Sequence, residues 1–255
     1  MPASEPAHVL ITGASSGIGA ALALAYARPG AHLSLGGRSQ DRLGAIAAQV
    51  EARGASVSIA AIDVRERAAV ADWATAADGQ SPLDLVIANA GISGGTHGGP
   101  ETADQTRAIF AVNLEGVLNI ALPVMPRMIA RGRGQIAIIS SLAAFRGFPG
   151  APAYSASKAA VKAWGEALRA DLAPKGVRVN VVMPGFVKSG MTDANDFPMP
   201  FLISAERAAG IIRRGLAANR ARIAFPFPTA FVAWAMGALS PRIADPLLRR
   251  LPKKD

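Results

Sequence analysis

The segment HVLITGASSGIG, residues 8–19, joins a short β-rich apolar run to a glycine-rich turn, and the residues after it, AALALAYA, have helical periodicity. Gly13 permits a tight turn, Gly17 leaves room for a phosphate to approach the backbone, and Gly19 lets the helix pack closely on the strand. The amino terminus of the helix then offers free N–H groups to an anion. An ordinary glycine-rich turn is the alternative, but the flanking strand and helix favour a site for the pyrophosphate of a dinucleotide.

Runs similar to the first strand recur along the chain, and stretches with helical periodicity lie between them. These runs are residues 32–35, 57–62, 84–89, 135–140 and 177–183. They are almost continuously apolar, as expected for strands that are covered on both faces. A repeated alternation of strand and helix indicates a parallel sheet with right-handed crossovers. The sequence therefore predicts a doubly wound α/β fold of the Rossmann type, in a single domain over residues 1–255 with an added C-terminal helical tail.

The composition excludes several classes of protein. Hydrophobic residues make up 51% of the 255 residues, which is enough for a sizeable core, and there is no cysteine. Disulfides and thiolate metal sites are therefore impossible, and the three single, scattered histidines make a poor metal site, so we expect no metal. The N-terminal segment lacks a basic region followed by a long apolar run. We therefore expect no signal peptide and a cytoplasmic protein.

The formal net charge is +9, which could indicate a nucleic-acid partner. Nine of the basic residues, however, lie between Arg213 and the C-terminus, and the rest of the chain is nearly balanced. The basic residues are also not interleaved with aromatic residues on which bases could stack. We therefore expect no nucleic-acid partner.

The segment YSASK, residues 154–158, places a phenol and an ammonium group four residues apart. On a helix this spacing puts Tyr154 and Lys158 on one face, where the cation can lower the pKa of the phenol from its usual value of about 10. A lone pair of this kind is usually two neighbours on a solvated helix face. Its meaning depends on the motifs that accompany it.

Those motifs occur in a fixed order relative to the predicted strands. After the glycine-rich turn come Asp63–Val64, Asn89–Ala90–Gly91, Val112–Asn113, Ser141, Tyr154 with Lys158, and Pro184–Gly185. In this order and spacing the sequence resembles the short-chain dehydrogenase/reductase family, of the single-domain type with a Ser-Tyr-Lys-Asn catalytic tetrad.

The resemblance implies a role for each member of the tetrad. Tyr154 would exchange a proton with a carbonyl or hydroxyl oxygen, and Lys158 would lower the pKa of Tyr154 and hold the nicotinamide ribose. Ser141 would orient the same substrate oxygen. Asn113 would hold a water that connects Lys158 to solvent. The alternatives are that Ser141 only caps a turn after its strand and that Asn113 is an amide at a helix kink.

The resemblance also implies the residues that bind the cofactor. They are Gly13, Ser15, Ser16, Gly17, Ile18, Gly19, Arg38, Asp63, Val64, Asn89, Ala90, Gly91, Tyr154, Lys158, Pro184, Gly185, Val187 and Ser189. Gly37 stands where an NAD-binding relative would carry an acid, and Arg38 follows it, so we expect NADP(H). Arg38 could instead be a solvated loop residue, and Asp41 is close enough in sequence to compete. The hydroxyl that the family places after Pro184–Gly185 could belong to Ser189 or to Thr192.

Residues 186–203 are predicted to form a mobile flap over the substrate. The flap includes Met191, Phe197, Met199 and Phe201, which indicates a fairly apolar substrate unless the flap only packs on its own domain. The expected function is an NADP(H)-dependent oxidoreductase that interconverts a carbonyl and a primary or secondary alcohol on a small molecule. The alternative is a non-catalytic NADP(H)-binding sensor or scaffold at a membrane surface. The resemblance further implies a homodimer or homotetramer.

Residues 223–255 form an apolar and basic tail on which the resemblance gives little help. No charged residue occurs between Ile223 and Pro241, but the prolines limit a regular helix to about residues 228–240. Such a helix is about 20 Å long and cannot span a hydrocarbon core of about 30 Å. One interpretation is a helix at an anionic membrane surface, peripheral to the inner face of the membrane. In the other, Phe231, Val232, Trp234 and Leu239 pack on the catalytic domain or on a neighbouring subunit and cover the substrate pocket.

Overall fold

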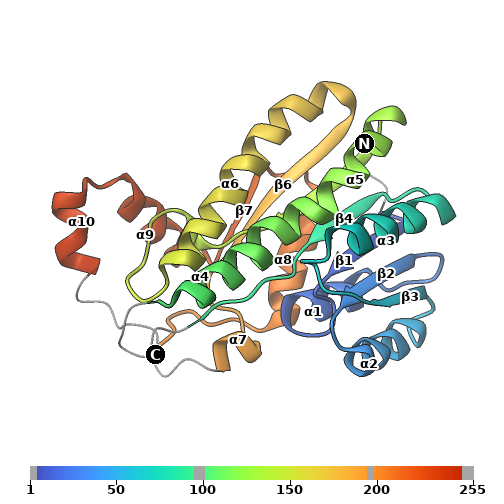
Figure 1. Cartoon of the computed structure of the whole chain (residues 1–255), viewed down its shortest axis with the longest axis horizontal. Helices are drawn as coiled ribbons and strands as arrows, with labels where there is room; N and C mark the ends of the chain where they lie inside the picture. The colour runs from blue at the N-terminus through green and yellow to red at the C-terminus, as the bar shows by residue number, and fades with distance from the viewer. Residues whose placement is uncertain (1–4, 95–100, 194–197, 249–255) are drawn as a thin grey trace.

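The computed structural model describes residues 5–94, 101–193 and 198–248. Its centre is a seven-stranded parallel sheet with the order β3-β2-β1-β4-β5-β6-β7 (Figure 1). The strands are β1 (His8–Thr12), β2 (His32–Gly37), β3 (Ser56–Ala61), β4 (Leu85–Ala88), β5 (Gly134–Ile139), β6 (Val177–Pro184) and β7 (Arg222–Phe225). The strand order reverses between β1 and β4, which is where a doubly wound sheet opens a crevice at the carboxyl ends of its strands. The predicted fold class is confirmed.

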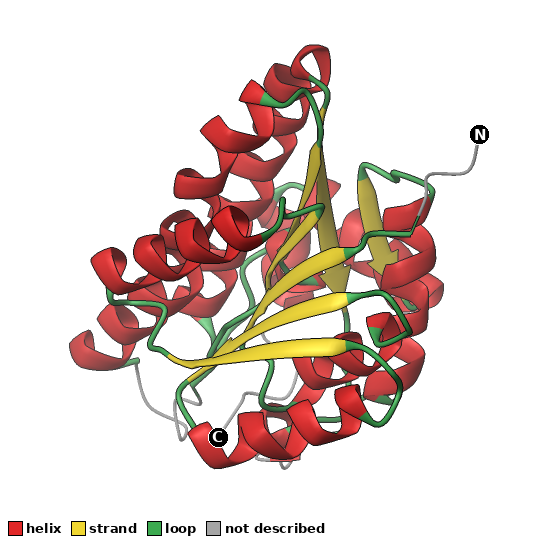
Figure 2. Ribbon diagram, turned by 90° about the vertical axis from the view of Figure 1, so that its right-hand side faces the viewer, coloured by secondary structure: helices red, strands yellow, loops and turns green. Residues whose placement is uncertain are grey.

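Helices cover both faces of the sheet (Figure 2). They are α1 (Gly17–Tyr26), α2 (Gln40–Glu51), α3 (Arg67–Gln80), α4 (Ala103–Phe110), α5 (Gly116–Ala130), α6 (Pro152–Leu172), α7 (Gly190–Asp193), α8 (Ala205–Ala217), α9 (Phe227–Ala238) and α10 (Pro241–Leu248). A π-helical turn, η1 (Ala111–Glu115), joins α4 to α5, and a 3-10 turn, η2 (Leu142–Ala144), follows β5. One core lies under α1, α2 and α8, and a second lies under α3, α5 and α6.

The continuous hydrophobicity of the strands follows from this arrangement. In β1, Val9 and Ile11 point into the core under α1 and α8, whereas Leu10 between them points into the core under α3 and α5. All three side chains are fully buried. Because successive side chains point to opposite faces, a strand with helices on both sides is apolar at every position.

The helical stretch Ala103–Ala130 is long and apolar enough to cross a membrane by length and composition alone. Core helices of soluble proteins have the same properties. Here Val117, Ile120 and Val124 are buried against the sheet and α3. We therefore interpret this stretch as part of the core.

The sequence analysis missed β7 and placed the start of the tail at residue 223, which is wrong. All four residues of β7 pair with β6; Ile223 and Phe225 are buried in the core, whereas Arg222 and Ala224 are exposed. β7 is an edge strand of four residues with alternating exposure, directly followed by two prolines, so it lacks the continuous apolar signal of the other strands. The tail outside the sheet begins at Pro226.

The prediction that prolines bound the tail helix is confirmed, because α9 covers Phe227–Ala238. A second helix, α10, follows directly and had not been predicted separately. Both lie at the end of the molecule opposite α2 and β3 (Figure 1). Phe231, Val232 and Trp234 are each more than half exposed. Phe231 and Trp234 therefore do not pack on their own catalytic domain, whereas Val232 borders the large cavity described below. Packing of these side chains on a neighbouring subunit stays a prediction.

Candidate active site

The carboxyl ends of the central strands open into a cavity of about 1580 Å³. Within the described chain, the cavity is lined by every residue predicted for cofactor binding or catalysis except Gly19 and Asn113. The predicted site residues, which are spread over most of the sequence, are thus brought together. The two exceptions lie directly behind the cavity wall and support it.

The loop between β1 and α1 has a backbone that only glycine adopts easily. Gly13 and Gly17 have φ angles of 67° and 53°. A β-carbon at Gly13 would lie 2.9 Å from the Cα atom of Ala90, and one at Gly19 would overlap the Gly13 carbonyl oxygen. Ser16 precedes α1 without forming a side-chain cap in the described structure, so the first N–H groups of α1 remain available to a phosphate.

Thr12 and Asn89 connect this loop to the end of β4. The Thr12 hydroxyl accepts hydrogen bonds from the N–H groups of Asn89 at 3.0 Å and Ala90 at 3.1 Å. The Asn89 amide donates to the Thr12 carbonyl oxygen at 2.9 Å. These bonds hold the glycine-rich loop against Asn89–Ala90–Gly91. The sequence analysis did not assign this role to Thr12.

Two arginines stand at the far end of the cavity, beyond the end of β2. Arg38, in the bend before α2, and Arg42, in the first turn of α2, both line the cavity, and Gly37 at the end of β2 has no carboxylate. Asp41 is exposed on α2 and is outside the cavity lining in the described structure. Asp63 also lines the cavity, but Arg65 holds its carboxylate at 2.7 Å and lowers its pKa through side-chain hydrogen bonds. The sequence analysis missed Arg42, whose signal was its spacing of four residues from Arg38.

Tyr154 and Lys158 lie one turn apart on α6, as predicted. The Nζ atom of Lys158 lies 5.8 Å from the centre of the Tyr154 ring and donates to the Ile139 carbonyl oxygen at 2.9 Å. Burial lowers the pKa of Lys158 to about 8. Burial also raises the pKa of Tyr154, and a hydrogen-bond interaction with Ser141 opposes part of that rise. The expected lowering of the pKa of Tyr154 is therefore not achieved by the protein groups alone, because desolvation dominates.

The interpretation of Ser141 as a turn cap is correct, and its role toward the substrate oxygen stays a prediction. Its hydroxyl accepts from the Ala143 N–H at 3.1 Å and so caps η2 at the end of β5. Ser141 is almost fully buried and also lines the cavity with Tyr154.

Asn113 lies in the π-helical turn, so the interpretation as an amide at a helix irregularity is correct. Its side chain accepts from the Ile92 N–H at 2.8 Å and donates to the Ile92 carbonyl oxygen at 2.9 Å. A further bond of 3.1 Å reaches the Ser157 hydroxyl on α6. A β-carbon at Gly91 would lie 3.2 Å from Asn113 Oδ1 and 3.3 Å from Lys158 Nζ. Asn113 therefore ties the loop after β4 to α6 next to Lys158.

The two candidate hydroxyls of the flap differ in their partners. The Thr192 hydroxyl accepts from the Ser189 N–H at 2.8 Å and bonds carbonyl oxygens of its own loop. Ser189 instead faces the glycine-rich loop, with its Cβ 3.2 Å from the position of a β-carbon at Gly17. This geometry favours Ser189. Met191 and Phe201 line the cavity, whereas Phe197 lies outside the described residues.

Besides Met191 and Phe201, the apolar substrate end of the cavity is lined by seven residues, of which the sequence analysis assigned only Phe186 and Val232 to cover the substrate. They are Phe148, Pro149 and Phe186, with Val232 and Met236 from α9 and Leu247 and Leu248 from α10. Below them, Glu101 accepts from the Ala153 N–H at 2.9 Å and so caps the first turn of α6, directly before Tyr154.

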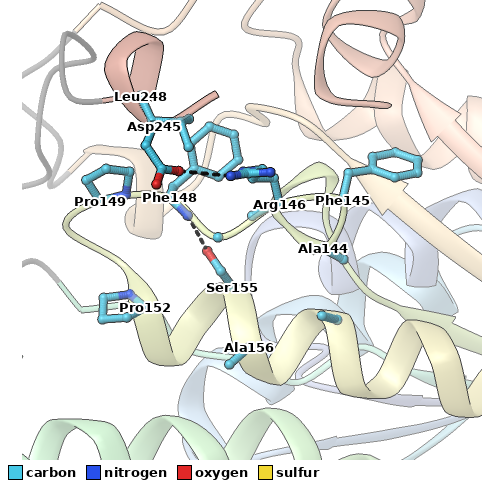
Figure 3. Close-up of a pocket in the computed structure, with 13 residues that line it drawn as sticks. Ala144, Phe145, Arg146, Phe148, Pro149, Pro152, Ser155, Ala156, Asp245 and Leu248 are labelled. Atoms are coloured by element: carbon cyan, nitrogen blue, oxygen red, sulfur yellow. Dashed lines mark hydrogen bonds and ion pairs between the residues drawn. The ribbon is translucent and has the colours of Figure 1, made fainter. Parts of the chain in front are cut away.

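A smaller cavity of about 580 Å³ lies beside the loop that follows η2 (Figure 3). Arg146 of this loop and Asp245 of α10 face each other there at 2.9 Å, and the Ser155 hydroxyl accepts from the Phe148 N–H at 3.2 Å. Arg146 also donates to the Leu239 carbonyl oxygen at 3.0 Å. The loop is thereby fixed to both C-terminal helices. Across the described ranges, no group of three or more His, Asp or Glu residues could hold a metal ion.

The fold and the cavity define a dinucleotide-binding α/β protein with a tyrosine and a lysine at its reactive end. The chain belongs to the short-chain dehydrogenase family, whose model, described as short chain dehydrogenase, matches residues 7–197. An uncharacterized oxidoreductase of Myxococcus xanthus is 39% identical over 243 residues, covering 95% of this chain and 96% of that protein. The protein is thus an oxidoreductase by family.

Two solved structures extend the comparison to the cofactor. A short-chain dehydrogenase from Sphingobium yanoikuyae in complex with NADPH is 27% identical, with a TM-score of 0.79 and coverage of 97% of both chains. A short-chain dehydrogenase from Mycobacterium paratuberculosis bound to NAD is 26% identical, with a TM-score of 0.76 and coverage of 85% of this chain and 94% of that one. Relatives of this fold therefore bind either nicotinamide cofactor.

Proposed function

We propose that the protein is an NADP(H)-dependent oxidoreductase that interconverts a carbonyl compound and a primary or secondary alcohol, with Tyr154 as general acid and base. The observation that carries this proposal is a single cavity in which Tyr154, Ser141 and Lys158 lie beside the glycine-rich loop. A nicotinamide dinucleotide supplies hydride transfer when it is bound. A protein that only bound the cofactor would not need Tyr154, and no comparison supports a non-catalytic sensor or scaffold.

The residues at the other end of the cavity fit a dinucleotide. A β-carbon at Gly13 would press on Ala90 and one at Gly17 would approach Ser189. Glycine at both positions therefore lets the loop lie close to these neighbours, while the backbone N–H groups at the start of α1 can bind a pyrophosphate. Ser15 and Ser16 line the same part of the cavity and add hydroxyl groups.

The choice of NADP over NAD rests on local charge, because relatives bind either cofactor. Arg38 and Arg42 offer two guanidinium groups where the adenosine ribose of a dinucleotide would lie. Gly37 places no carboxylate there to repel a 2′-phosphate. Both features favour the phosphorylated cofactor.

The proton step uses residues at the end of β5 and on α6. Tyr154 gives its phenolic proton to the carbonyl oxygen during reduction and removes the hydroxyl proton during oxidation. The ammonium group of Lys158 stabilises the phenolate, and Ser141 holds the substrate oxygen toward Tyr154. Asn113 is a positioning residue that fixes Ile92 and α6.

The substrate is proposed to be apolar over most of its surface. The flap contributes Phe186 and Met191 to the cavity, and α9 contributes Val232 and Met236. Residues 186–203 would close over this end when the substrate binds.

The test is consumption of NADPH by the purified full chain, with a panel of apolar ketones, aldehydes and quinones, and the reverse reaction with the matching alcohols. We expect turnover of at least one compound, with one alcohol formed for each NADPH oxidised and weaker activity with NADH. Binding of NADPH without turnover of any compound in either direction would favour the sensor alternative.

A further inference from the structure

Exposed apolar side chains are concentrated at one end of the molecule. The large hydrophobic residues with substantial exposure are Leu122, Met191, Phe201, Leu202, Phe227, Phe231, Val232, Trp234, Ile243 and Leu247. All except Leu122 belong to the flap or to α9 and α10. Scattered exposed hydrophobic residues are normal, but a concentration of this kind marks an interaction surface.

The helix α9 is oriented with its small residues inward and its aromatic residues outward. Ala230 and Ala233 are buried against η2 and β6. Phe227, Phe231 and Trp234 are 79%, 55% and 52% exposed, and their rings stack in series with centroids 6.3 Å and 5.9 Å apart. An amphipathic surface helix in water normally has the reverse arrangement. These three residues form a preformed aromatic ridge.

The ridge lies next to the mouth of the large cavity. Met191, Phe201, Val232 and Leu247 are exposed and also line the cavity. The rim of the mouth is therefore apolar on the flap side and on the side of α9 and α10. Contact of this apolar rim with water is unfavourable. An apolar phase could bury the ridge and the rim of the mouth at the same time.

The sequence of this region carries an excess of positive charge, and one of its cations, Arg242 of α10, belongs to the part of the chain that the structure describes. No charged residue occurs between Ile223 and Pro241, and five basic residues follow, against Asp245 and Asp255. Asp245 is paired with Arg146. Arg242 is exposed and has no ion-pair partner in the described ranges. An apolar surface that carries an exposed cation without an ion-pair partner, in a segment with excess positive charge in its sequence, is complementary to an anionic layer.

We propose that α9, α10 and the apolar rim dock on an anionic lipid surface, with the mouth of the cavity facing the lipid. A second copy of the chain fits less well, because a symmetric contact would press two faces with the same excess of positive charge, including the exposed Arg242 of each copy, against each other. The 12 residues of α9 reach about 18 Å, so the helix lies in the interface and does not cross the membrane. The contact would let an apolar substrate enter directly from the lipid.

The first experiment is flotation of the full chain with vesicles of phosphatidylcholine alone and of phosphatidylcholine mixed with phosphatidylglycerol. We expect the protein to float with the anionic vesicles and to be released by high salt, which screens the charges. The double variant Phe231→Ser, Trp234→Ser should lower binding at least about ten-fold. Arg242→Ala should lower it roughly five-fold. Leu122→Ser, which removes an exposed hydrophobic side chain from α5 on another part of the surface, is the matched control and should bind as the wild type does.

A second measurement identifies the contact directly. Brominated lipids should quench the fluorescence of Trp234, since the other two tryptophans, Trp73 and Trp164, pack against the core. Trp234→Phe should keep vesicle binding and lose this quenching. The proposal is overturned if the protein does not float, if it floats equally well with neutral vesicles, or if the double variant binds normally. It is also overturned if the double variant dissociates an oligomer of the free protein, which would assign the ridge to a second copy. NADPH turnover without vesicles is independent of all these outcomes.

Discussion

The loop after β1 and the end of α9 both depend on a glycine at a tight contact, yet their surroundings differ. Gly19 is enclosed by the Gly13 carbonyl group and the Asn89 amide, and hydrogen bonds fix both neighbours. Gly237 meets the Phe145 carbonyl group on one side only, and the other side of α9 is exposed. At the cofactor end the chain supplies all of its own partners. At the C-terminal end the aromatic side of α9 is left uncovered, which is the observation behind the proposed lipid contact.

The largest expected effect is on kcat and comes from Tyr154, which lies in neither of these two regions. Tyr154→Phe removes the transferable proton and leaves the glycine-rich loop and α9 untouched. We expect kcat to fall by about 10²–10⁴-fold, with NADPH affinity nearly unchanged, measured by turnover and by cofactor titration. Ser141→Ala should act in the same direction. Wild-type turnover by Tyr154→Phe would show that the proton comes from another group.

The pH dependence of stability measures how much the burial of Lys158 at the cofactor end destabilises the folded protein. Its pKa is about 8 in the fold, against 10.5 in the unfolded chain, so the unfolded state holds an extra proton between these values. Burial of the protonated Lys158 lowers the free energy of unfolding by about 3 kcal/mol below pH 8. This loss of stability disappears as the pH rises toward 10.5.

Chemical denaturation of the protein without cofactor should therefore show a free energy of unfolding that rises from pH 8 to about pH 10. Lys158→Met removes the titrating group and should flatten this rise, while gaining stability at pH 7. Tyrosine ionisation begins near the top of this range, so the slope is read below pH 10. Equal slopes for both proteins would show that Lys158 is not buried as described.

The sequence predicted the cofactor end well because backbone geometry limits which residues can occur there. The glycines of residues 13–19 and the strand runs are local features, and they led to the correct sheet and cavity. The Thr12–Asn89 bonds join residues 77 positions apart, so no local pattern contains them. Arg42 could be found only once α2 was known to begin at Gln40 and to turn its first residues toward the cavity.

The C-terminal end was predicted less well for a different reason. Prolines gave the limits of α9, but β7 has only four residues and α10 contains Pro246. Phe231 and Trp234 point outward because the opposite face of α9, with Ala230 and Ala233, packs on the core, and the sequence alone does not show which face does so. Similarly, the raised pKa of Tyr154 follows from packing around α6, which the spacing of Tyr154 and Lys158 does not reveal.

Substitution of Arg38 at the cofactor end should change the affinity for the cofactor and leave the C-terminal end unchanged. Arg38→Ala should reduce the preference for NADPH over NADH by about 1.5–3 kcal/mol, the scale of a charge-assisted hydrogen bond. Arg42→Ala should act in the same direction. Dissociation constants for both cofactors give the measurement, with NADH affinity as the internal control. Equal affinity of the wild type for the two cofactors would exclude the NADP assignment.

A matched set of glycine substitutions compares the two regions directly. Gly19→Ala should destabilise the protein by about 1–3 kcal/mol and weaken NADPH binding, because the surrounding backbone cannot move. Gly237→Ala has a similar overlap, but α9 can shift outward, so we expect a cost below about 1 kcal/mol and normal NADPH affinity. Gly44→Ala in α2 meets nothing within 4 Å and should be neutral or stabilising by about 0.5–1 kcal/mol. Equal losses at Gly19 and Gly237 would contradict the comparison.

The smallest effect is expected at the ion pair that joins α10 to the loop after η2. Asp245 is 51% exposed in its side chain, and Arg146 keeps its bond to the Leu239 carbonyl group without it. Asp245→Asn should therefore change the free energy of unfolding by less than about 1 kcal/mol. Arg213→Ala, which breaks a more exposed pair between α8 and Glu5 in the segment before β1, is the control and should cost about as little.

A difference between the Asp245 and Arg213 variants should appear only in substrate binding. Leu247 and Leu248 follow Asp245 on α10 and line the cavity, so a looser α10 should raise KM for an apolar substrate while kcat and NADPH affinity stay the same. A loss of more than about 2 kcal/mol in Asp245→Asn would exceed what a half-exposed ion pair supplies. In that case α10 is held as firmly as the glycine-rich loop, and the contrast between a self-contained cofactor end and a partner-dependent C-terminal end does not hold.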